Sequence, residues 1–405
     1  MEFPLTTSAA ESPAWKNRFI LALLIGFPAT GFVQKYAGLP GVAGYLAGVV
    51  AVAQAIGCFA PRFVRPLNKH FRMVSVAVIV GLLAGFVWLH PFEDNKGPGK
   101  SSDRDEALEL AVTRLANGET PYYPAGNPQA GPLSVLPGSI ALAAPFVALG
   151  NVGYQNVAWL AVLLFALAWR FKNPALALCL LLVPLVVSPA ALYEFISGGD
   201  LIANGIFVAL GFLFALQAWL SADTPAWRRW LACGLLGIAL ASRPNFLLLA
   251  PLFVACVWRA RGLRQGLLAG LLTGLTSVAL IVPFYFHDPA GFTPLKAKQK
   301  LAVADAMVPW ASKAMIGITL LAGLLAALWL WRKRDANPIT DFFRGCALVT
   351  LTPMLGAIAL ATWVHGYLDL DFMRDRFGLM YVFFALFGWG GAWFGRSRES
   401  SSRLA

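Results

Sequence analysis

The chain has 405 residues, of which 58% are hydrophobic and only 13% are charged, and its formal net charge is +12. Soluble domains carry about 25% charged residues, so this composition excludes an ordinary water-soluble globule and indicates a membrane protein. The positive charge does not indicate nucleic-acid binding, because the Lys and Arg residues stand in short clusters between apolar runs, as membrane orientation requires. All five Cys lie in apolar runs and show neither disulfide nor metal-ligand spacing.

Apolar runs long enough to cross a membrane recur along the whole chain. We therefore expect an all-α, polytopic membrane protein of about twelve transmembrane helices, with residues 1–405 forming one transmembrane domain. The candidate spans are 19–37, 41–61, 73–91, 153–169, 175–193, 201–220, 230–242, 244–258, 265–286, 312–331, 342–364 and 377–395.

The distribution of charge predicts that both termini are cytoplasmic. In that orientation about 20 of the 32 basic residues lie inside, whereas about 14 of the 20 acidic residues lie outside. Residues 133–149 are apolar but short and contain two prolines, and counting them as a span would place the later basic clusters outside. We therefore predict a re-entrant or interface-lying helix at 133–149, within a large outer loop at 92–152.

The apolar run 230–258 is interrupted by Ser242-Arg243-Pro244-Asn245. Proline disfavours helix at the residue before it, so we expect two short helices that meet at this break. Each is about 18–21 Å long, less than the ~30 Å hydrocarbon core. Arg243 would then sit at the floor of a cavity that opens outward, and a charge within the membrane is a candidate functional group.

The outer loop contains an acidic segment, Ser101 to Gly118, with the apolar spacing of an amphipathic helix on the membrane surface. Asp103 and Glu106 have the spacing of a capping box, and Asp105 lies between them. Acids at a helix start also complement its macrodipole without any chemistry. At the outer surface beside a cavity, however, these carboxylates are candidates to take a proton from a hydroxyl or to hold a divalent metal.

Further candidate binding residues follow. Glu194 and Asp200 lie on the short turn before the span at 201–220, where Asp200 is also a candidate helix cap. Tyr122, Tyr123 and Asn127 lie in a Pro- and Gly-rich stretch that suits either sugar stacking or a rigid interfacial loop.

Cations predicted to face outward form a third group. Arg243 is the strongest candidate to bind a phosphate, with Lys313, Arg374 and Arg376 as helpers. Arg374 and Arg376 adjoin three aspartates, so local pairing is the simpler alternative for them. The lysines of 296–300 are more typical of contacts with lipid headgroups.

The chain resembles the GT-C class of integral membrane glycosyltransferases, in particular the bacterial mannosyltransferase-like and arabinosyltransferase-like members that use polyprenyl-phosphate sugars. The resemblance covers about residues 75–260 and is carried by loose motifs. Leu108 stands where the family usually has an aromatic residue. The matching positions are Asp103, Asp105, Ala111, Leu115, Gly118, Pro121, Tyr122, Pro132 and Pro137 of the outer loop, Ser188-Pro189 with Asp200, and Arg243-Pro244.

The resemblance implies a protein of the bacterial inner membrane that moves a pentose or hexose, with inversion, onto a hydroxyl of a cell-envelope glycan or lipid. Asp103, or alternatively Asp105, would act as the base, with Glu106 among the substrate-binding residues. These aspartates are also candidates to bind a divalent metal, Mg²⁺ or Mn²⁺. The alternative function is a twelve-span transporter or flippase of an envelope lipid or sugar, since broken helices also mark transporter sites.

Overall fold

The computed structural model describes residues 13–94, 102–123, 133–296, 305–306, 308–333, 337–376 and 378–394, which contain helices and no strand. The prediction of an all-α protein is confirmed for these ranges. The α-helices are α1 (Ala14–Gly26), α2 (Thr30–Phe59), α3 (Val64–Lys69), α4 (Phe71–Asp94), α5 (Arg104–Ala116), α6 (Pro137–Ala148), α7 (Tyr154–Phe171), α8 (Pro174–Val187), α9 (Pro189–Ile196), α10 (Leu201–Leu220), α11 (Ala226–Leu240), α12 (Ala250–Arg261), α13 (Leu263–His287), α15 (Ala311–Arg332), α16 (Pro338–His365) and α17 (Leu379–Trp389). The 3₁₀ segments are η1 (Phe27–Ala29), η2 (Ala60–Phe63), η3 (Pro244–Leu249), η4 (Thr293–Lys296), η5 (Asp371–Asp375) and η6 (Gly390–Ala392).

Seven helical stretches in the described ranges are long and apolar enough to cross a membrane, or eight if the bent pair α8–α9 counts as one span. A polytopic membrane architecture follows from this. The count of about twelve stays a prediction, because α11 has 15 residues and α12 has 12. At 1.5 Å per residue these helices are about 18–23 Å long, short of a ~30 Å hydrocarbon core.

The long stretch Ala14–Lys69 folds back on itself. A non-helical residue, Gly38, with φ +64°, interrupts α2. The Arg18 Nε donates to Gln54 Oε1 at 2.9 Å, and the Gln54 Nε2 donates to the Trp15 carbonyl at 3.0 Å. Residues near 15 and near 54 therefore lie side by side, and the stretch consists of two antiparallel arms that match the predicted segments 19–37 and 41–61.

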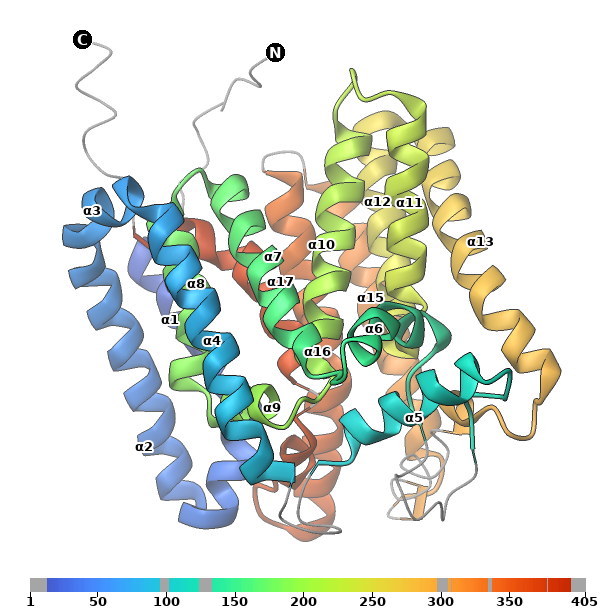
Figure 1. The fold of residues 1–405 in the computed structure, drawn as a ribbon, viewed down its shortest axis with the longest axis horizontal. Helices are drawn as coiled ribbons and strands as arrows, with labels where there is room; N and C mark the ends of the chain where they lie inside the picture. The colour runs from blue at the N-terminus through green and yellow to red at the C-terminus, as the bar shows by residue number, and fades with distance from the viewer. Residues whose placement is uncertain are drawn as a thin grey trace.

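The two ends of the described chain lie together, because the Arg18 Nη1 donates to the Trp393 carbonyl at 2.8 Å. The short helix α3 lies at one end of the bundle, whereas α5 and α9 lie at the other (Figure 1). We call the end that bears α5 and α9 the α5 end. Its exposure to the cell exterior remains a prediction from the charge distribution.

The helix α10 forms the centre of the bundle. Its sequence is apolar on all sides, as is typical of a helix surrounded by other helices, and 83% of its most apolar window is buried. The same fraction is 17% for α13 and for α15, which therefore line the outside of the bundle. Asp200 directly precedes α10, so the central helix begins at a buried carboxylate.

The predicted break in 230–258 is present. The helix α11 ends at Leu240, and the 3₁₀ turn η3 separates it from α12. Since α12 begins at Ala250, the predicted helix start at 244 was six residues too early. A helix end leaves carbonyl groups without intrahelical partners. Here the amides of Leu136 and Gly138 donate to the Ser242 and Ala241 carbonyls, both at 2.8 Å. The start of α6 therefore supplies hydrogen-bond donors to the free carbonyl groups at the end of α11.

The predicted continuous span 175–193 is divided by a bend. The helices α8 and α9 meet at an angle of 91°. Ser188 has extended backbone angles, its Oγ accepts a hydrogen bond from the Ala191 amide at 3.4 Å, and Pro189 begins α9. A proline fits the first turn of a helix but cannot continue the preceding one. The bend carries Glu194 toward α5.

We expect Gly138→Ala to destabilise the fold. A Cβ at this position would lie 2.2 Å from the Ile238 carbonyl oxygen and 2.7 Å from that of Ala241, both backbone atoms. The α6–α11 contact would have to open, at a cost of about 1–3 kcal/mol. Thermal unfolding in detergent measures the loss. Gly234→Ala in α11, where the added Cβ meets open space, is the matched control. Equal melting temperatures for the two variants would contradict the close packing of α6 against the end of α11.

Candidate functional site

Charged side chains from six segments converge at the α5 end. We call this group the α5-end cluster. It comprises His90 and Glu93 of α4, Arg104 and Asp105 of α5, Glu194 of α9, Asp200 before α10, Arg243 at the break after α11, and Arg376 after η5. Four of its acids, Glu93, Asp105, Glu194 and Asp200, are at most 6% exposed.

Glu194 is completely buried and holds two arginines. Its Oε2 lies 3.3 Å from the Arg104 Nη1 and 3.1 Å from the Arg376 Nη1. Its Oε1 accepts the Leu201 amide at 2.9 Å, which satisfies a free N–H at the start of α10. Two guanidinium groups thus share one carboxylate oxygen. Their side chains are 19% and 13% exposed, so both guanidinium groups are partly accessible beside Glu194.

Arg376 is held from several sides in a strained backbone conformation. Its φ of +60° lies in the left-handed region, which costs a residue with a Cβ roughly 1–2 kcal/mol. The guanidinium donates to the hydroxyls of Ser197 and Ser102, both at 3.3 Å, and stands 4.5 Å from the centre of the Tyr193 ring. Backbone strain that several contacts maintain is typical of functional positions.

Arg243 and Asp200 form a buried ion pair. The Arg243 Nη2 lies 2.7 Å from the Asp200 Oδ1, and the two side chains are 7% and 3% exposed. Asn204 donates to Asp200, while the Ser139 hydroxyl donates to Asn204 at 3.2 Å, which links α6 to the pair. The Arg243 Nε is buried without a hydrogen-bond partner. The charge of Arg243, the predicted phosphate ligand, is therefore compensated by Asp200.

Asp105 points inward from α5 and is 6% exposed. Its Oδ2 lies 3.9 Å from the His90 Nε2, and a Cβ on Gly198 would approach the same oxygen to 3.1 Å. The His90 Nδ1 faces the Ile196 carbonyl at 3.0 Å, so Nδ1 carries the proton and the other nitrogen faces Asp105. Burial, together with the neighbouring Glu106 carboxyl, raises the pKa of Asp105 to about 10. Asp105 is therefore protonated at neutral pH.

Asp103 lies at the N-cap of α5 and is exposed. Its side chain makes no capping hydrogen bond, so the predicted capping box with Glu106 does not form. Glu106 is half-buried, and one of its oxygens is buried without a hydrogen-bond partner. In the described ranges, no group of three or more His, Cys, Asp or Glu residues is arranged to hold a metal ion.

The predicted sugar-binding tyrosines are 3% exposed each. The Tyr122 ring lies 4.8 Å from that of Phe292, and its hydroxyl donates to the Val135 carbonyl at 3.4 Å. Burial raises the pKa of Tyr123 to about 12. Both rings pack between α5 and α6 and support the loop, rather than forming an open wall. Asn127 lies outside the described residues.

The structure brings together five predicted site residues: Asp105, Glu194, Asp200, Arg243 and Arg376. Lys313 is exposed at the start of α15 and is not among them, and the side chain of Arg374 lies outside the described part.

Sequence reasoning missed His90, Glu93, Tyr193 and Arg104. The signal that could have revealed the first two is their i, i+3 spacing at the polar end of an apolar run. No known family, curated protein or solved structure matches the chain.

We expect Asp105→Asn to change how stability depends on pH. A carboxyl whose pKa is raised in the folded state contributes stability that is complete below its unfolded value of 3.8 and is lost as the pH rises toward about 10. The wild-type protein should therefore become progressively less stable as the pH rises through this range, and Asp105→Asn should lose less stability. Melting temperatures from pH 5 to 9 test this. Asp103→Asn, at an exposed position, should keep the wild-type slope.

Removing one partner of the Asp200–Arg243 pair should be costly. Arg243→Met leaves a buried carboxylate unpaired and should destabilise the protein by about 3–5 kcal/mol. The double variant Asp200→Asn/Arg243→Met should recover most of the loss, because neither charge remains. Arg114→Met, which breaks the exposed pair with Glu119, should cost less than about 1 kcal/mol. Additive effects of the two buried substitutions would contradict direct pairing.

Proposed function

We propose that the protein is a glycosyltransferase of the GT-C type. It would transfer a sugar from a polyprenyl-phosphate donor to an acceptor hydroxyl of an envelope glycan or lipid at the α5 end, with inversion. One observation carries this proposal: two partly exposed arginines converge on a single buried carboxylate, next to a loop helix that begins with acids. The membrane architecture supplies the lipid environment that such a donor needs.

Arg104 and Arg376 would bind the donor phosphate. Guanidinium groups recognise phosphate through several N–H donors in a planar fork, and Glu194 fixes the position of both. Two adjacent cations suit this role, because negative charge grows on the leaving phosphate as the glycosidic bond breaks. Arg243 would contribute indirectly, since its partner Asp200 follows Glu194 by only six residues.

Asp103 would accept the proton of the acceptor hydroxyl. It precedes Arg104 in the chain and faces solvent, so an acceptor from the aqueous phase can reach it. A base is required because a hydroxyl is a poor nucleophile at neutral pH. Asp105, whose pKa is raised by burial, would instead hold the start of α5 against His90. Donor, base and acceptor would then meet at the first turn of α5.

The test is transfer by purified protein in lipid nanodiscs, with radiolabelled polyprenyl-phosphate sugars and envelope extract. Arg376→Ala, Arg104→Ala and Asp103→Asn should each lower transfer at least about 100-fold while the protein stays folded. Arg114→Ala, on the same helix, should retain wild-type activity.

Wild-type activity in all three site variants would overturn the assignment of these residues. Movement of intact donor lipid between the two leaflets of vesicle membranes, without sugar transfer, would favour the flippase alternative.

A further inference from the structure

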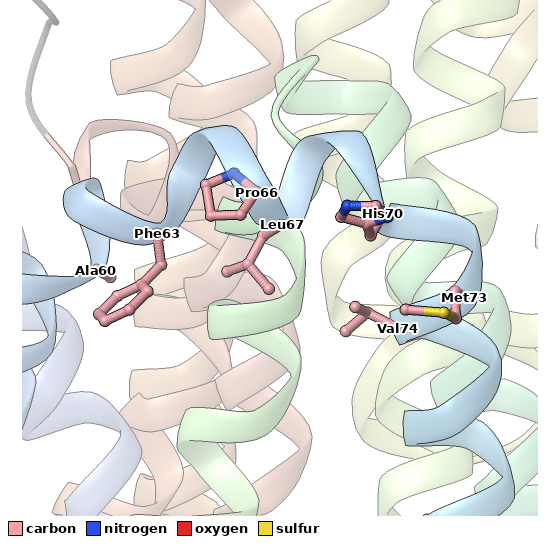
Figure 2. Close-up of a pocket in the computed structure, with 7 residues that line it drawn as sticks. All are labelled: Ala60, Phe63, Pro66, Leu67, His70, Met73 and Val74. Carbon is pink, nitrogen blue, oxygen red and sulfur yellow. The ribbon is translucent and has the colours of Figure 1, made fainter.

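A groove lies at the end of the bundle opposite the α5-end cluster. Two adjoining hollows, of about 510 and 320 Å³, share Leu67 and Val74 among their lining residues. They run beneath η2 and α3 and continue between α4 and α8, and almost all of their lining is apolar. Figure 2 shows Phe63 and Leu67 hanging from the η2–α3 ribbon, with Val74 at the start of α4. We call this feature the α3 groove.

Prolines explain why this segment turns over the groove instead of extending α2. Pro61 stands in the first turn of η2, and Pro66 falls within α3. Each lacks an amide donor, so the long helix cannot continue in a straight line. The Asn68 side chain accepts the Ala175 amide at 2.9 Å, which ties α3 to the start of α8. The roof of the groove is therefore tied to the start of α8.

The same segment is strongly basic. Arg62, Arg65, Lys69 and Arg72 are all exposed, and the chain contains no Asp or Glu from residue 12 to residue 92. Arg62, Arg65 and Lys69 follow i, i+3, i+7, which places them on one face of the helical segment. Phe63, which lines the groove, follows the same spacing with Pro66 and His70 on another face. The segment thus presents cations beside an apolar hollow.

We propose that the α3 groove binds an anionic diacyl phospholipid. The phosphate would contact Arg62, Arg65 and Lys69, while an acyl chain would occupy the hollow between α3, α4 and α8. Orientation of spans requires basic residues near this end, but it does not require a groove beneath them. Basic pockets between membrane helices favour anionic headgroups, whereas a zwitterionic headgroup brings its own cation into the cluster. This site is independent of the proposed transfer reaction.

The test is native mass spectrometry of the full chain, titrated with palmitoyl-oleoyl phosphatidylglycerol or with the matching phosphatidylcholine. The first lipid should bind at least about tenfold more tightly, because each basic residue at a membrane surface contributes about fivefold. Arg62→Gln/Arg65→Gln/Lys69→Gln should abolish this preference. Arg228→Gln/Arg261→Gln/Arg264→Gln removes the same charge from the ends of α11, α12 and α13 and should preserve the preference.

Equal binding of the two lipids by the wild-type protein would overturn the proposal. So would an equal loss of preference in both triple variants, since general charge would then explain the binding. Glycerol 3-phosphate should not compete with the phosphatidylglycerol. Effective competition by glycerol 3-phosphate would show that the groove contributes nothing to lipid binding, and would also refute the proposed site. Leu67→Trp, which fills the hollow, should weaken phosphatidylglycerol binding with all basic residues in place.

Discussion

The burial of Glu194 constrains the whole α5 end of the molecule. An ionised carboxylate removed from water is tolerated only when cations and amide donors surround it. Arg104 comes from the loop helix, Arg376 from the segment before α17, and the Leu201 amide from the central helix. Since all three partners contact one buried carboxylate, the three segments are held together as a unit.

The break after α11 obeys the same requirement. Its free carbonyl groups accept hydrogen bonds from the start of α6, and its cation, Arg243, forms an ion pair with Asp200. Glu194, in α9, and Asp200, directly before α10, are six positions apart, so a single short segment pairs with arginines from three parts of the chain. The 91° bend between α8 and α9 makes this arrangement possible, because a straight helix would carry Glu194 away from α5.

Much of the architecture could be predicted from the sequence because apolar length and proline position act locally. The break at Arg243-Pro244 and the reversal between the first two predicted spans were visible in this way. The bend at Ser188 was missed because the apolar run continues through it. At the site, individual charged residues were recognised, but their pairing was not. Asp200 reads as an ordinary helix cap, and only the fold places it against Arg243.

The order of segments along the chain has a consequence for biosynthesis. The helices α11 and α12 are each shorter than the bilayer interior, and a guanidinium lies at their junction. Released separately into lipid, this hairpin would expose an uncompensated cation to hydrocarbon. The ribosome, however, delivers Asp200 and α10 first, so the counter-ion is already present when Arg243 emerges. The hairpin is therefore expected to leave the insertion machinery together with α10, as one assembled unit.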